Sequence, residues 1–311
     1  MPRRVRVPPK PQVFAAPYTV KPRDHQHTHT MILLHERGNN GKRFGRMLLK
    51  ATDLDKRFPT VKFVFPSAKD CHDTVSKRKA TAHWYPCNIG ERILPQHADT
   101  EVPLQFQAAG LAETGRYIRS LIDREAAVLA EAGSSTTNGG YDRVVLGGLG
   151  LGGAAALFTL LGGPNRLGGF IGLDAWLPVQ KIIFPALGVS QSEEGRLVEC
   201  LEAVNEVRDM LALEPLEPDH GDGDELRSTG KRLEHLEVPM LLADALGLKD
   251  EEEIDDRRSL VTTMGLFGLD VSWVGFHEIE SWHRAYDQTE AIVKFLKPIV
   301  DGKAGEASDE E

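Results

Sequence analysis

A short apolar run near the middle of the chain leads into a turn made largely of glycine and then into a run of small residues. The segment reads Val144-Val145-Leu146-Gly147-Gly148-Leu149-Gly150-Leu151-Gly152-Gly153-Ala154. A strand, a sharp turn and a helix in this order present the nucleophile of many serine hydrolases, for which the motif is G-x-S-x-G. Gly148 and Gly152 complete that frame, but Gly150 stands at its centre and offers no hydroxyl. We expect the flanking glycines to be required because strand and helix nearly touch at such a turn.

The same glycines fit two other interpretations. Gly148, Gly150 and Gly153 have the spacing of a dinucleotide-binding fingerprint, which would place a pyrophosphate at the start of the following helix. Asp174 lies about 20 residues further on, where that fingerprint has an acidic ribose ligand. The remaining interpretation is a tight strand-to-helix turn that binds nothing.

Motifs in the rest of the chain favour the first interpretation. They are Leu34-His35-Glu36-Arg37-Gly38-Asn39-Asn40, Phe65-Pro66-Ser67-Ala68, Trp84-Tyr85, Gln107 with Gly110-Leu111, the glycine turn, and Trp176-Leu177-Pro178. In type and order these segments resemble the acyl-protein thioesterase and small carboxylesterase family of α/β hydrolases, especially its fungal branch. The resemblance extends from Thr30 to Leu296.

The resemblance implies an α/β-hydrolase fold, in which helices cover both faces of a mostly parallel sheet. It also implies a serine, histidine and aspartate triad that cleaves acyl esters or thioesters without a cofactor or metal. Gly150 occupies the serine position, Leu151 would supply one backbone N–H of the oxyanion hole, and the turn at Glu36 and Arg37 would supply the other. The family has glycine where this chain has Glu36, so a carboxylate is expected near the developing negative charge, which would weaken its stabilisation.

The other two triad positions are less regular. The histidine is best placed at His283, ahead of a helix expected at Gln288–Leu296, with His277 as the alternative. The acid position holds Leu248, and Asp250 is the preferred substitute if the loop bulges, with Asp244 as the other nearby carboxylate.

These departures predict that serine-dependent turnover is lost or strongly reduced. The nucleophile forms the acyl-enzyme, the histidine takes its proton and the acid fixes the histidine tautomer. Loss of the serine alone costs about 10⁶ in kcat in a serine protease. Two alternatives stay open: slow hydrolysis by a water that His283 activates, and a non-catalytic role in binding an acyl ligand or another protein. The pocket for the acyl chain is expected at Trp84, Trp176 and Trp282.

Weaker signals elsewhere have structural explanations. Cys87 and the Ser134-Ser135 loop offer side chains that could replace the missing serine, but neither is expected to act as the nucleophile. The alternating histidines of the His25–His29 segment have a metal-like spacing, but no carboxylate accompanies them and no metal site is predicted. The acidic segment Asp219–Glu225 lacks the full calcium-loop pattern.

The elements that position these residues alternate between short apolar runs and longer amphipathic ones, which is typical of a parallel sheet covered by helices. We predict strands at Met31–Leu34, Val61–Phe65, Val144–Leu146, Phe170–Leu173, Met240–Leu242 and Val271–Val274, and helices at Leu104–Ala132, Ala154–Leu161 and Arg196–Leu211.

Composition bounds the remaining possibilities. The 311 residues carry 37 basic and 46 acidic side chains, a formal charge of −9 that argues against nucleic-acid binding. Three cysteines without C-x-x-C spacing favour a reducing, cytoplasmic location, and no apolar run is long enough to predict a membrane helix. We expect a flexible arm at 1–24, one hydrolase domain at 25–300 with an acidic insertion at 185–237, and a disordered acidic tail at 301–311.

Overall fold

The chain folds around one seven-stranded sheet in a computed structural model, which describes residues 13–71, 81–87, 102–132, 138–180, 190–217, 233–244, 260–275 and 286–302. The strand order is β1-β3-β2-β6-β7-β8-β9, with β1 antiparallel to β3 and all other neighbours parallel. The strands are β1 (Tyr18–Val20), β2 (His29–Leu34), β3 (Val61–Phe65), β6 (Val144–Leu149), β7 (Gly169–Leu173), β8 (Pro239–Asp244) and β9 (Asp270–Gly275). A separate antiparallel pair joins β4 (Lys69–Cys71) to β5 (Thr81–His83). The predicted strands are all present, and the parallel sheet expected for an α/β hydrolase is confirmed.

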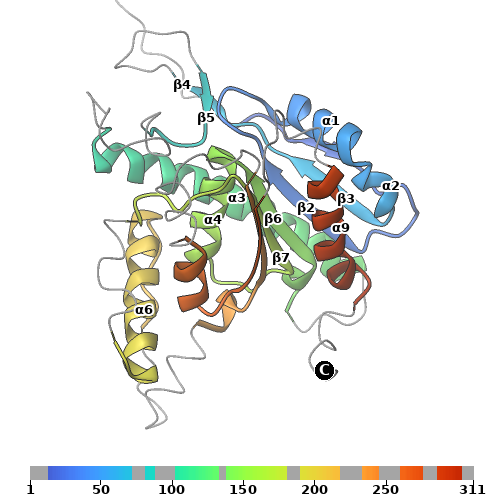
Figure 1. Cartoon of the computed structure of the whole chain (residues 1–311). Helices are drawn as coiled ribbons and strands as arrows, with labels where there is room; N and C mark the ends of the chain where they lie inside the picture. The colour runs from blue at the N-terminus through green and yellow to red at the C-terminus, as the bar shows by residue number, and fades with distance from the viewer. Residues whose placement is uncertain are drawn as a thin grey trace, which may run out of the picture.

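Helices cover both faces of the sheet (Figure 1). One face carries α1 (Gly41–Thr52), α2 (Leu54–Arg57) and α9 (Tyr286–Val300); the other carries α3 (Leu104–Ala132), α4 (Leu151–Leu161) and α6 (Glu193–Met210). Two short 3-10 turns, Tyr141–Arg143 and Glu234–Leu236, precede β6 and β8.

Alternation along β2 shows how one strand serves two cores. Met31 and Leu33 pack in the core beneath α1 and α9, whereas Ile32 and Leu34 pack in the core beneath α3 and α4. Successive side chains of a strand point to opposite faces, so a strand between two helical layers is apolar throughout. Helix α4 is buried along its whole length, which explains its sequence of glycine, alanine and leucine.

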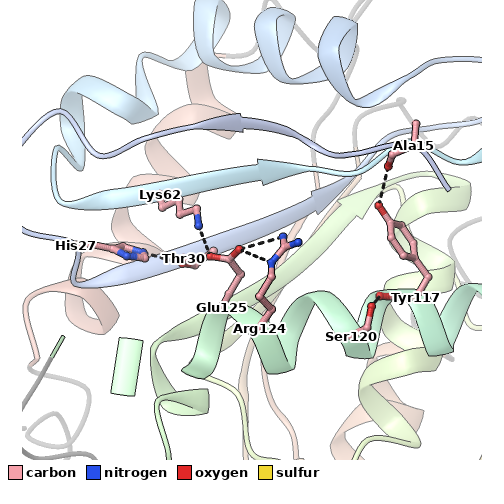
Figure 2. Close-up of polar contacts among 8 residues, drawn as sticks. All are labelled: Ala15, His27, Thr30, Lys62, Tyr117, Ser120, Arg124 and Glu125. Carbon is pink, nitrogen blue, oxygen red and sulfur yellow. Dashed lines mark hydrogen bonds and ion pairs between the residues drawn. The ribbon is translucent and has the colours of Figure 1, made fainter. Parts of the chain in front are cut away.

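The N-terminal segment packs against the sheet and α3 from further upstream than its composition predicted. The expectation of a flexible arm through residue 24 is wrong for its last part, because Tyr18–Val20 forms β1 and pairs with β3. The ring of Phe14 stacks on Tyr117 of α3 at 4.0 Å between centroids. The Tyr117 hydroxyl donates to the carbonyl of Ala15 at 3.3 Å (Figure 2).

A buried carboxylate joins α3 to the sheet. Glu125 is 1% exposed and accepts hydrogen bonds from Lys62 of β3 at 2.6 Å and from Thr30 of β2 at 3.4 Å. The guanidinium of Arg124 lies on its other oxygen at 3.2 Å, and His27 contacts Thr30 at 2.8 Å (Figure 2). A carboxylate this deep is tolerated because cations and hydrogen bonds surround it.

The acidic segment at 185–237 contributes to the same core. Its described part contains α6, where Cys200, Leu201, Val204 and Val207 pack into the cluster formed with α3 and α4. Burial raises the pKa of the Cys200 thiol to about 11, so this cysteine is a packing residue. Among the described residues, no helix combines the length and the apolar character required to cross a bilayer.

Candidate functional site

The turn between β6 and α4 has the geometry of a nucleophile elbow. Gly150 stands between strand and helix with φ 55° and ψ −122°, a conformation that favours glycine. Its N–H donates to the carbonyl of Leu173 at the end of β7 at 2.8 Å, and its carbonyl accepts the N–H of Ala154 at 2.9 Å. The turn is therefore fixed on both sides, and whatever residue stands at 150 is held at the carboxyl edge of the parallel strands.

The neighbouring glycines are required by packing, as the sequence predicted. A Cβ on Gly148 would lie 2.7 Å from the carbonyl oxygen of Leu34 and from the carbonyl carbon of Gly152. A Cβ on Gly152 would lie 2.4 Å from the carbonyl oxygen of His35. These are backbone atoms, which cannot rotate away. Close packing therefore accounts for both glycines without a bound nucleotide.

Gly150 differs from its neighbours because its side-chain direction is open. Among the described residues, the only heavy atom within 4 Å of a Cβ built there is Cβ of Glu36, at 3.6 Å, which is ordinary van der Waals contact. A serine would therefore fit at 150 apart from the strain of its positive φ.

The loop after β2 supplies the other side of the site, and His35 holds it. The backbone N–H of Ala68 donates to Nε2 of His35 at 3.0 Å, so this nitrogen carries no proton. Nδ1 is consequently protonated and donates to the carbonyl of Glu36 at 2.7 Å. Burial lowers the pKa of His35, which agrees with a neutral ring. Both ring nitrogens are engaged, so His35 positions Glu36.

Trp84 supports the same loop from within the core. Its indole N–H donates to the carbonyl of His35 at 2.7 Å, and its ring is 3% exposed. The backbone of Gly38 donates to Ala82 of β5 at 2.8 Å, which fixes the far end of the loop. The contacts give Trp84 a structural role; that its face also lines an acyl pocket stays a prediction.

Glu36 lies next to the elbow, with its Cβ 3.6 Å from the Cβ position of residue 150. Oε1 accepts a hydrogen bond from the side-chain amide of Asn39 at 2.7 Å. Oε2 is buried and has no hydrogen-bond partner. Glu36 therefore lies beside residue 150, and its expected effect on a developing oxyanion stays a prediction.

Two oxyanion-hole candidates lie at this edge. Leu151 is the first residue of α4, where backbone N–H groups have no acceptor within the helix. Arg37 follows Glu36 in the turn and is partly exposed. Their use by an oxyanion stays a prediction.

Two further residues lie at the carboxyl edge. Asp174 directly follows β7, is 5% exposed and has φ 50°, and its N–H donates to Ala243 of β8 at 2.8 Å. The sequence suggested Asp174 only as the acidic residue of a dinucleotide fingerprint, and the structure places it directly after β7. The indole N–H of Trp176 is buried without a hydrogen-bond partner.

Several predicted site residues fall outside the described part of the chain. These are His283, His277, Asp250, Leu248 and Trp282. Asp244, the other acid considered, is the last residue of β8. The histidine and acid of the triad therefore stay predictions.

The histidines at the start of the chain serve other purposes. His27 contacts Thr30 at 2.8 Å, and His29 contacts the hydroxyl of Thr28 at 3.1 Å. Across the described ranges, no group of three or more potential ligands is arranged to hold a metal ion. Asp219–Glu225 lies outside those ranges.

Comparison with known proteins identifies the family of this fold and turn. A family model described as phospholipase/carboxylesterase matches residues 16–189, which is more than half of the 311 residues. The chain belongs to the phospholipase/carboxylesterase family. The match includes both β6 with its turn and the loop at Glu36.

The relatives agree with this assignment. Acyl-protein thioesterase 1 of Cryptococcus neoformans is 28% identical over 153 residues, 49% of this chain and 56% of that protein. Acyl-protein thioesterase 1 of Emericella nidulans is 30% identical over 165 residues, 52% of this chain and 62% of that protein. The match thus spans less than two thirds of these relatives. The crystal structure of acyl-protein thioesterase 2 from Zea mays shares the fold, with a TM-score of 0.56, 14% identity, and coverage of 91% of this chain and 98% of that one.

Proposed function

We propose that this family member receives an acyl ester or thioester at the carboxyl edge of its sheet and does not process it through a covalent serine intermediate. The observation that carries the proposal is Gly150: the elbow retains its turn, its hydrogen bonds and its close-packed glycines, but its central residue has no nucleophilic atom. Covalent acyl transfer needs an oxygen or sulfur at that point.

The substrate class follows from the family and from the thioesterase relatives, which are similar to about half of this chain. The acyl group would be carried by a small molecule or by a protein, and no cofactor would be needed. Among the described residues, neither Cys87 nor Cys200 forms a disulfide, which supports a reducing, cytoplasmic location.

A fluorophosphonate probe tests the proposal, because it labels only activated serines. We expect no labelling of the full chain under conditions in which a serine carboxylesterase control is labelled completely. Gly150→Ser provides the matched variant, since its Cβ has room beside Glu36. Labelling of the unmodified chain at any serine would refute the proposal.

The alternative is binding without turnover, and it rests on the same substitution at 150. Addition of a long-chain fatty acid would then raise the unfolding temperature while p-nitrophenyl acyl esters were hydrolysed only at the buffer rate.

A further inference from the structure

Phe14 joins the start of the described chain to both α3 and β4. Its ring stacks on Tyr117 of α3, with 4.0 Å between the centroids and 5° between the planes. The ammonium of Lys69, the first residue of β4, lies 4.5 Å from the centroid of the same Phe14 ring. Lys69 also forms an ion pair with Glu113, one turn before Tyr117 on α3. Phe14, Lys69, Glu113 and Tyr117 therefore form a closed set of contacts, which we call the clasp.

The residues on either side of Phe14 differ in how they are held. The Tyr117 hydroxyl donates to the carbonyl of Ala15 at 3.3 Å (Figure 2), whereas Val13 is 85% exposed. The ring of Phe14 and the backbone of Ala15 thus attach this segment to α3. The family model begins at residue 16, so Phe14 precedes the matched part of the chain.

The β4–β5 pair is small enough to depend on such contacts. β4 and β5 have three residues each and form a pair separate from the seven-stranded sheet. An isolated two-stranded pair is at best marginally stable in water. Lys69 is opposite His83 in this pair, and its side chain is only 13% exposed because it lies in the clasp. We therefore expect the contacts with α3 to decide how well the β4–β5 pair is ordered.

The β4–β5 pair and its flanking residues hold the loop after β2. The N–H of Ala68, the residue directly before β4, donates to Nε2 of His35 at 3.0 Å. The N–H of Gly38 donates to the carbonyl of Ala82 in β5 at 2.8 Å. Trp84, directly after β5, donates its indole N–H to the carbonyl of His35 at 2.7 Å. Three hydrogen bonds thus join this small pair to the loop.

The loop in turn forms one side of the elbow. Nδ1 of His35 donates to the carbonyl of Glu36 at 2.7 Å. Cβ of Glu36 lies 3.6 Å from the Cβ position of residue 150. A displacement of β4 would therefore pass through His35 to the residue that stands beside Gly150.

We propose that Phe14 is a positioning residue, which keeps Lys69 on α3 and thereby fixes the loop beside Gly150. The N-terminal segment then controls how well this side of the candidate site is ordered. The inference goes beyond the proposed function, because it concerns the order of the loop and not the fate of an acyl group. Only its consequence for an acyl ligand rests on that function.

Hydrogen exchange of single backbone amides in the full chain tests the inference, because exchange reports local opening. The reporters are the N–H groups of Gly38 and Ala68, whose hydrogen bonds hold the loop. The reference is the N–H of Gly150, which bonds to the end of β7. Phe14→Ala removes both ring contacts, so exchange of the two reporters should become at least about fivefold faster while the reference changes little.

Three further variants separate the ring contacts from a general effect of substitution. Val13→Ala is the matched control, since this exposed neighbour makes none of the contacts of the clasp, and it should exchange as the wild type does. Phe14→Tyr keeps an aromatic ring and should hold the reporters within about twofold of the wild type. Lys69→Met keeps an apolar stem but removes the cation, so both reporters should exchange faster than in the wild type.

The inference is overturned if Phe14→Ala leaves both reporters within about twofold of the wild type. It is also overturned if the amide of Gly150 accelerates as much as the reporters, because the effect would then be one of general stability. An equal acceleration by Val13→Ala would count against it in the same way. None of these outcomes depends on whether a fluorophosphonate labels a serine, which is the result that would refute the proposed function.

Discussion

Alanine substitutions at two glycines of the elbow should have very different effects on stability. Gly150→Ala adds a methyl group whose nearest described neighbour, Cβ of Glu36, is 3.6 Å away. Gly152→Ala adds one that would lie 2.4 Å from the carbonyl oxygen of His35 and 2.7 Å from two backbone atoms of Leu34. The first variant meets only backbone strain, and the second meets fixed atoms.

The structure gives a magnitude for each variant. At Gly150, φ of 55° imposes about 1–3 kcal/mol of strain, offset by about 0.5–1 kcal/mol because alanine restricts the unfolded chain. Gly150→Ala should therefore cost about 1–2 kcal/mol. At Gly152 helix propensity favours alanine by about 1 kcal/mol, but β2 and α4 must move apart to admit the methyl group. We expect a net cost above about 3 kcal/mol, the upper end for overpacked cores.

Urea unfolding followed by tryptophan fluorescence and by circular dichroism measures both costs. The expected order of the free energy of unfolding is wild type, then Gly150→Ala, then Gly152→Ala, with similar m-values. Gly152→Ala is also expected to give the lowest yield of folded protein. If Gly152→Ala were as stable as Gly150→Ala, the close approach of helix and strand in this turn would be wrong.

Two further predictions concern the opposite end of the sheet. Burial and then Arg143 lower the pKa of His29 from 6.5 to about 4, so the unfolded chain takes up its proton first as pH falls. The contribution of neutral His29 to the free energy of unfolding is fully present above pH 6.5, and it should decline by at most about 3 kcal/mol toward pH 4. Urea titrations over this pH range should show a smaller decline in the free energy of unfolding for His29→Asn than for the wild type. An equal decline would contradict the prediction. Glu125→Gln removes the partner of Lys62 and should cost about 3 kcal/mol, whereas Glu113→Gln at the surface should cost less than about 1 kcal/mol. Equal thermal shifts for the two variants would argue against a buried ion pair.

The central sheet and the long helix α3 could be predicted because burial leaves a direct mark on the sequence. Strands covered on both faces are continuously apolar, and Leu104–Ala132 repeats its buried residues with helical spacing. Helix α1 was missed although Asn40 caps it through a 2.9 Å bond to the backbone of Arg43. β1 was missed because three residues at an edge produce no period, and its pairing with β3 is decided by the tertiary structure.

In the candidate site, too, some features could be predicted from the sequence and others could not. The turn at Gly150 could be predicted because tight backbone packing selects glycine at fixed spacing. The role of His35 could not, because its two ring bonds go to backbone atoms that no sequence pattern identifies. A histidine beside such a turn suggests chemistry, yet both ring nitrogens of this one are engaged. Likewise, the unused oxygen of Glu36 depends on side-chain direction, which only the folded chain determines.

The unequal crowding around the elbow has a consequence for how such a chain can diverge. Substitutions at Gly148 and Gly152 are removed by selection for folding, whatever the protein does, because they push a main chain apart. Position 150 is not constrained by packing in this way. Replacement of a serine by glycine at such a position removes the nucleophile and also relieves backbone strain. A single mutation can thus remove one catalytic activity while the fold persists. The stable fold then remains available for a different function.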